Sequence, residues 1–151
     1  WACVLDYGRP PRVTVVLDKA THTRELIEAS GAFALQLPTR AQLALTVGVG
    51  TDSLHTMPDK LMRHGVQLFE APVGDVPLVA GCVGWLACRL RPEPHNQQAY
   101  DLFIGDVVGA WANEQVFRTG RWQFDAAPDE LRTIHHVAGG QFFVTGAAVQ
   151  A

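Results

Sequence analysis

The residues best suited to chemistry lie in one short segment, Leu17–Glu25, where a β-rich run passes directly into the start of a helix. A helix N-terminus offers unpaired N–H groups and a partial positive charge, which suit a phosphate group. Thr21 and Thr23 add hydroxyl donors, and Lys19 and Arg24 supply cationic groups. The alternative is that a threonine only caps the helix while the charges stay solvated. Spacing alone does not decide between the two interpretations.

Three other groups of residues are weaker candidates for a site. Gly48–Ser53 lacks the Gly-Lys-Ser/Thr ending of a phosphate loop, so we expect a mobile surface loop there. Asp52, Ser53 and His55 lack the surroundings of a catalytic serine. His135 and His136 point in opposite directions on an extended segment, and no cysteine or carboxylate lies at ligand spacing from them. We therefore expect no metal site.

The composition predicts a single domain with a real core. The chain has 151 residues, of which 48% are hydrophobic and 18% are charged, and its net charge is −3. Without a basic stripe, a nucleic-acid partner is not expected. The longest apolar stretch, 76–87, is interrupted by proline and glycine and is too short to span a membrane. Three cysteines without metal-like spacing favour reduced thiols and a cytoplasmic protein.

Strands outnumber helices in the predicted order of elements. Turn residues 8–11 separate the first two strands, which we expect to be neighbours, and the segment 91–96 joins the last two long strands as an antiparallel pair. Glycines inside long strands suggest bends or bulges. The predicted strands are Ala2–Leu5, Arg12–Asp18, Ala32–Leu37, Pro77–Leu90 and Tyr100–Ala112, and the predicted helices are His22–Ser30, Thr39–Leu45 and Met57–His64. This pattern favours a β-barrel with short helical inserts.

Three segments in order resemble the flavin reductase-like, FMN-binding split-barrel family, of the flavoredoxin and two-component monooxygenase reductase type. The run 11–27, followed by Gly31-Ala32-Phe33, resembles the family's strand, its turn rich in Lys, Ser and Thr, and the helix that follows. Residues 100–108 resemble its signature strand, and residues 135–142 resemble its C-terminal glycine motif.

The resemblance implies a mainly β, Greek-key split barrel over residues 1–151, and a homodimer with FMN held near the interface. Because the chain opens in what looks like the middle of a strand, we expect the family's N-terminal strand to be missing from it. Tyr100 stands where many flavoredoxin-like members carry His. The residues expected at the cofactor are Trp1, Lys19, Thr21, His22, Thr23, Lys60, Tyr100 and Phe142.

The activity implied by the resemblance is NADH- or NADPH-dependent reduction of FMN, with a monooxygenase as a partner that receives reduced flavin. In such chemistry the cofactor does the difficult step, and no catalytic acid or base is required of the protein. Two alternatives stay open at this point. One is a flavoredoxin-like electron carrier that keeps its FMN, and the other is a split-barrel module that has lost FMN.

Overall fold

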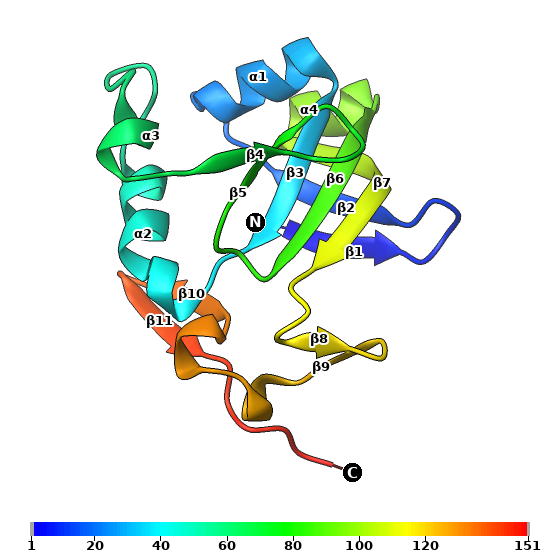
Figure 1. Cartoon of the computed structure of the whole chain (residues 1–151). Coiled ribbons are helices and arrows are strands. Elements are labelled where there is room, and N and C mark those ends of the chain that lie inside the picture. The colour runs from blue at the N-terminus through cyan, green and yellow to red at the C-terminus, as the bar shows by residue number, and fades with distance from the viewer. Residues whose placement is uncertain (1, 151) are drawn as a thin grey trace.

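A computed structural model describes residues 2–150 and has a five-stranded antiparallel sheet at its centre (Figure 1). The strands lie in the order β1, β2, β7, β6, β3. Neighbouring strands such as β1 and β2 are consecutive in the sequence, whereas β2 and β7 are far apart in it. The predicted pairing of the first two strands is confirmed, and so is the pairing of the two long ones. The strands are β1 Ala2–Asp6, β2 Arg12–Val16, β3 Ala32–Leu37, β6 Gly84–Arg91 and β7 Leu102–Ala112.

Glycine and a bulge shape the two longest strands where they pair. The register between β6 and β7 shifts at Ala87 and Cys88, so that Val108 of β7 is left without a partner. A Cβ atom on Gly105 would lie 2.5 Å from Cζ of Phe33, so only glycine lets that ring approach β7 this closely. The expected link between internal glycines and bulges is confirmed at Gly109, which borders the register shift, whereas Gly105 lies in regular register.

One face of this sheet carries the main core. Val13 and Val15 of β2, Phe33 of β3, Cys88 of β6 and Phe103 of β7 pack together with Ile27 from the helix that follows β2. Phe103 and Cys88 have no exposed surface. These long-range contacts attach the helix to the sheet and fix the position of its first turn.

The helices match the sequence predictions only in part. The helix predicted at His22–Ser30 is confirmed, ending at Gly31 in the left-handed conformation. Thr39 caps its segment as expected, through a capping box with Gln42. The helix after it runs further than predicted, and its last residues replace the surface loop expected at 48–53. The helices are α1 His22–Ser30, α2 Leu43–Thr51, α3 Lys60–Arg63 and α4 Pro94–Tyr100, with 3₁₀ turns at Arg40–Gln42, Phe124–Ala126 and Asp129–Leu131.

Two further expectations were wrong. The predicted strand Pro77–Leu90 is interrupted by a turn at Ala80–Gly81, where Gly81 has a positive φ, and forms two strands instead. The predicted linker 91–96 contains the start of α4, with Pro94 in its first turn, so Tyr100 ends a helix and does not begin a strand. The shorter strands form three hairpins: β4 Leu68–Glu70 with β5 Pro77–Val79, β8 Phe117–Arg118 with β9 Arg121–Trp122, and β10 Ile134–Ala138 with β11 Gln141–Val144.

Figure 1 shows α2 and α3 to one side of the sheet, with the β10–β11 hairpin beside α2. Within residues 2–150, no helix is both long and apolar enough to cross a membrane. The cysteines are all free: Cys3 is exposed, and Cys82 and Cys88 are buried.

Candidate functional site

A cavity of about 590 Å³ opens at the start of α1. The turn before α1 forms one wall, and the C-terminal end of α2 with the loop after it forms the other. Lys60, the first residue of α3, completes the lining. The lining residues are Asp18, Ala20, Thr21, His22, Thr23, Val49, Gly50, Thr51, Asp52, Ser53, Leu54 and Lys60.

Asp18 folds the turn that presents α1 to this cavity. Its carboxylate accepts a hydrogen bond from the backbone N–H of Ala20 at 2.7 Å, and its carbonyl accepts bonds from the N–H of Thr21 at 3.0 Å and from the hydroxyl of Thr21 at 2.8 Å. The Thr21 hydroxyl is thus used within the turn, and no side chain caps the amides of α1. The first turn of α1 therefore presents N–H donors to the cavity.

The opposite wall is held by polar contacts. The Lys60 ammonium group donates hydrogen bonds to the carbonyls of Val49 at 3.0 Å and Asp52 at 2.8 Å, at the end of α2. His64 Nε2 lies 2.6 Å from the Asp52 carboxylate. A side chain at Gly48 would clash with the His64 ring, which explains a glycine inside this helix. Lys60 thus places a positive charge at the border of the cavity, and its ammonium group also donates hydrogen bonds to carbonyls at the C-terminal end of α2.

A second hollow of about 390 Å³ continues from the far side of α2. It shares Gly50 and Thr51 with the first cavity, and Phe142 of β11 and His136 of β10 lie across it, with ring centroids 4.8 Å apart. Nothing lies within 4 Å of the position that a Cβ atom on Gly50 would occupy, so this residue borders open space.

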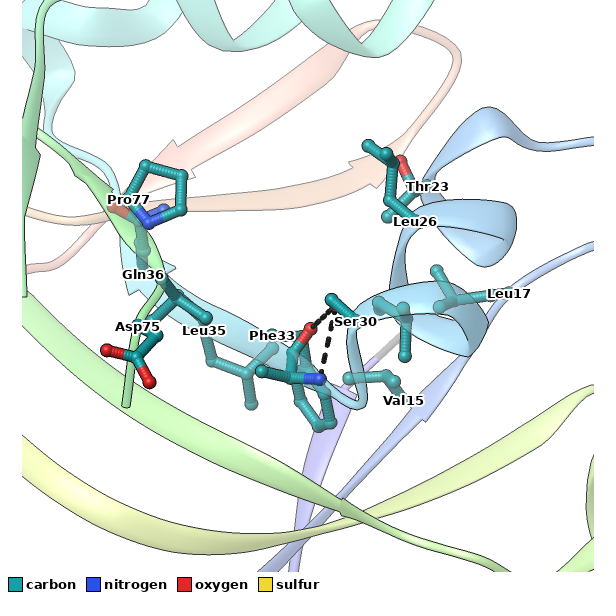
Figure 2. Close-up of a pocket in the computed structure, with 14 residues that line it drawn as sticks. Val15, Leu17, Thr23, Leu26, Ser30, Phe33, Leu35, Gln36, Asp75 and Pro77 are labelled. Atoms are coloured by element: carbon teal, nitrogen blue, oxygen red, sulfur yellow. Dashed lines mark hydrogen bonds between the residues drawn. The ribbon is translucent and has the colours of Figure 1, made fainter. Parts of the chain in front are cut away.

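A third cavity of about 470 Å³ is mainly apolar and lies between α1, β3 and the start of β5. Figure 2 shows Thr23 and Leu26 of α1 on one side, Asp75 and Pro77 on the other, and Phe33 and Leu35 between them. Thr23 is exposed and lines both this cavity and the one at the start of α1. Two different hollows therefore adjoin the candidate phosphate site.

The fold brings Thr21, His22, Thr23 and Lys60 together around one cavity, and it places Phe142 in the hollow next to it. Lys19 and Tyr100 lie elsewhere. The Lys19 ammonium group donates to the carbonyl of Gln98 at 3.0 Å, and Tyr100 is an exposed residue that packs edge-on against His95 of α4. Trp1 lies outside the described residues.

Arg24, which the sequence suggested as a balancing charge for phosphate, has another role. It is only 5% exposed and donates to Asp101 at 2.5 Å, to Glu28 at 2.9 Å and to the Gln97 carbonyl at 2.9 Å. Burial lowers the Arg24 pKa, but its hydrogen bonds to the two carboxylates outweigh that effect, so the pKa is raised overall. Arg24 therefore ties α1 to α4 and to Asp101 at its end, and it is not among the residues that line the cavity.

The sequence did not identify Gly50 and Thr51 as part of a site. Gly48 and Gly50 together suggested a loop, whereas the helix continues and Thr51 donates its hydroxyl to the Val47 carbonyl at 2.9 Å. The position of Gly50 and Thr51 beside the cavity depends on how α2 packs against α3 and the β10–β11 hairpin. No local pattern reports that packing.

Comparisons with known proteins agree with this architecture. Residues 1–128 match the model of the flavin reductase like domain. The chain is 41% identical over 152 residues to the protein YddH of Escherichia coli (strain K12), covering all of this chain and 78% of that protein. It is 56% identical to a protein from Shewanella baltica OS155 whose crystal structure is described as an FMN-binding domain of a flavin reductases-like enzyme. The TM-score is 0.96, and the match covers 100% of this chain and 78% of the Shewanella chain.

The chain belongs to the flavin reductase-like domain family. Its fold is the mainly β split barrel with short helices that the sequence predicted. Flavoredoxin of Desulfovibrio vulgaris (Miyazaki F) is 22% identical with a TM-score of 0.84, covering all of this chain and 78% of flavoredoxin, which supports the fold alone.

Proposed function

We propose that this chain binds FMN with the phosphate at the start of α1 and reduces it with NADH or NADPH. The observation that carries the proposal is the uncapped first turn of α1, which opens on a cavity of about 590 Å³ lined by Thr21, Thr23 and Lys60. Amides at a helix N-terminus, hydroxyl donors and a nearby cation are the groups that bind phosphate in proteins. The residues present therefore fit the anionic end of FMN.

The two carboxylates of the cavity do not oppose a phosphate strongly. Asp18 accepts a backbone hydrogen bond from Ala20, and Asp52 is paired with His64. The Lys60 charge lies beside them, held by two carbonyl groups. Neutral donors from α1 can then dominate the contact with the anion, because each carboxylate already has a partner.

We place the flavin ring toward Phe142. The hollow that contains Phe142 and His136 shares Gly50 and Thr51 of its lining with the phosphate cavity, so the two adjoin the same end of α2. Aromatic side chains favour stacked or edge contacts with a flat ring. The apolar cavity beside Leu26 is the other hollow within reach, so variants in the two hollows separate the two placements.

Bound FMN would supply the hydride-accepting chemistry, and the chain's residues bind and orient it. Thr21 fixes the turn that aims the α1 amides, Thr23 offers a hydroxyl to the phosphate, and Lys60 holds the end of α2 in place. Gly50 adds no side chain to either of the two hollows that it lines. These tasks require no proton transfer by a side chain.

The first experiment is an absorbance spectrum of the purified protein with FMN, recorded anaerobically before and after NADH or NADPH. We expect bound flavin whose blue absorbance is lost on reduction by a nicotinamide. Bound flavin that neither nicotinamide reduces would replace the reductase proposal with an electron carrier. No flavin binding would refute the proposal.

The placement of the ring is tested with two matched variants. Phe142→Ala should weaken FMN binding, because it removes an aromatic wall of the ring's hollow, whereas Leu26→Ala should leave the affinity close to wild type. The opposite order of affinities would move the ring to the apolar cavity. Titration of flavin fluorescence measures both variants.

We further propose a homodimer. A groove of about 330 Å³ between β1 and the tryptophan-rich ends of β6 and β7 exposes Val4 of β1 and Leu37 of β3. Contiguous exposed apolar surface of this kind is typical of protein interfaces. Sedimentation equilibrium should give twice the mass of the chain, and a Val4→Glu variant should sediment as a monomer. A monomeric wild-type protein would refute the dimer.

We also propose that the protein acts in the cytoplasm, where free thiols remain reduced. A monooxygenase is the proposed recipient of reduced FMN. Coupled turnover is measured twice, once with the reductase and the oxygenase in the same solution and once with a dialysis membrane between them. Turnover across the membrane would show that the flavin leaves the protein. Loss of all coupling across the membrane would argue for a carrier that retains its flavin.

A further inference from the structure

Three side chains that commonly bind metal ions meet at the rim of the α1 cavity. His22 and Glu25 lie on the first turn of α1, and His55 comes from the loop after α2. One potential ligand atom from each residue lies within 4.8 Å of the other two. The sequence offered no hint of this cluster, since His55 lies 30 positions after Glu25.

Both imidazoles face the same carboxylate. Nδ1 of His22 lies 2.9 Å from one oxygen of Glu25, and Nε2 of His55 lies 3.6 Å from the other. The two rings touch edge to face, with their centroids 4.9 Å apart. Two ring nitrogens and a carboxylate therefore converge on one small region, where a single cation could contact all three.

The loop that carries His55 is pre-shaped. The Ser53 carbonyl accepts hydrogen bonds from the N–H groups of Thr56 at 3.1 Å and Met57 at 2.8 Å, and the Ser53 hydroxyl accepts one from the N–H of His55 at 3.2 Å. His22 and Glu25 are fixed by the helix, three residues apart on one face. A cation would therefore bind to segments that are already ordered, so its binding needs little loss of conformational entropy.

We propose that His22, Glu25 and His55 form a binding site for a divalent transition-metal ion of the zinc class. Two imidazole nitrogens and one carboxylate suit Zn²⁺, Co²⁺ or Ni²⁺ and do not suit Mg²⁺ or Ca²⁺, which prefer oxygen ligands. Three protein ligands leave at least one position open, as in exchangeable zinc sites. The partial exposure of the three side chains gives a free ion access.

The proposed metal site should also affect the cavity beside it. This second effect rests on the proposed function, because it concerns bound FMN. His22 lines the cavity, and so do Ser53 and Leu54, the two residues before His55. A cation shared by α1 and this loop joins the two walls at the rim, with a positive charge next to the phosphate position. Metal binding should therefore slow the release of FMN.

The site is tested first without flavin. Isothermal titration of the flavin-free protein with Zn²⁺ should show one ion per chain, and Co²⁺ should give visible absorption bands from imidazole and carboxylate ligands. His55→Ala and Glu25→Gln should each weaken Zn²⁺ binding by about tenfold or more. His95→Ala, which removes an exposed histidine from α4, is the control and should bind as wild type does. Wild-type affinity in both site variants would overturn the proposal.

The effect on FMN is measured separately, as the dissociation rate of FMN with and without Zn²⁺. We expect slower release in the wild type when Zn²⁺ is present and no effect of Zn²⁺ in His55→Ala. Equal rates in the wild type would overturn the link between the two sites. A protein that binds Zn²⁺ as described but no FMN would leave the metal site established and refute the proposed function instead.

Discussion

The sheet and the helical side of this molecule are held together by different forces. The core face of the sheet is closed by apolar side chains, with Phe103 and Cys88 fully buried. Neither α2 nor α3 contains a buried residue. They are fixed by hydrogen bonds, from Lys60 to the end of α2, between His64 and Asp52, and through the Thr39 capping box.

Because of this difference, we expect the sheet to determine the stability of the protein and α2 and α3 to determine the geometry of the cavity. Burial of apolar surface stabilises the sheet against unfolding, because that contribution grows with the area removed from water. Hydrogen bonds add little net stability, but they fix geometry. Changes in the sheet should therefore lower stability and leave the cavity intact, whereas changes in α2 and α3 should alter the cavity first.

The largest expected effect is on the sheet. Phe103→Ala should lower the free energy of unfolding by about 3–5 kcal/mol, because it leaves a cavity among the side chains of β2, β3 and α1. Urea denaturation measures the loss. The control is Tyr7→Ala in the turn between β1 and β2, where the side chain is 91% exposed and its removal should cost almost nothing. A loss in Phe103→Ala no greater than in this control would refute the account of the core.

The sequence predicted those parts of the molecule whose stop and start residues act locally. The bounds of α1 were predictable because Gly31 adopts a left-handed conformation and its N–H bonds to the Ile27 carbonyl at 2.8 Å. The long antiparallel pair was visible as two apolar runs. The α4 helix was missed because Pro92, Pro94 and the polar residues around them looked like a linker, and a hydrogen bond from Arg24 to the Gln97 carbonyl stabilises it.

The candidate site was predictable to the same extent. Thr21, His22 and Thr23 lie on a single turn, so their proximity follows from the sequence. Lys60 was proposed only from a family resemblance, and its contact with the end of α2 needs the packing of α3. Gly50 and Thr51 were missed because glycines favour loops, yet Gly48 is required by the His64 ring.

The second prediction concerns the two buried thiols, Cys82 and Cys88. Burial raises the pKa of Cys88 to about 11, and burial also raises the pKa of Cys82 to about 11 against a smaller opposing effect of Gln42. At pH 8, below that pKa, only about one thiolate in a thousand forms, roughly a hundredfold fewer than for an unperturbed thiol. In Cys3→Ser protein, labelling by a disulfide reagent should therefore be slow until urea unfolds the chain. Rapid native labelling would show that the core opens.

The third prediction moves to the polar side. Lys60→Met should cost about 1–2 kcal/mol of stability, since it removes two hydrogen bonds from a partly exposed ammonium group to the carbonyls at the end of α2. It should also weaken FMN binding, because that helix end forms a cavity wall. Lys19→Met removes the corresponding contact with Gln98 outside the cavity and should leave FMN affinity unchanged. Equal losses of FMN affinity in both variants would show that only overall charge matters.

The smallest expected effect falls on Thr23, where binding should change and stability should not. Thr23→Ala removes one hydroxyl from the exposed first turn of α1, so the free energy of unfolding should stay within about 0.5 kcal/mol of wild type. FMN affinity should fall about three- to tenfold, the equivalent of the roughly 1 kcal/mol that one ordinary hydrogen bond contributes. Thr23→Ser keeps the hydroxyl and should restore most of the affinity. Thr14→Ala, whose hydroxyl bonds to the Cys3 carbonyl on the sheet, should leave FMN binding unchanged. An equal loss of affinity in the alanine and serine variants would mean that the methyl group of Thr23 contributes to binding, and would favour a ligand in the apolar cavity that Thr23 also lines.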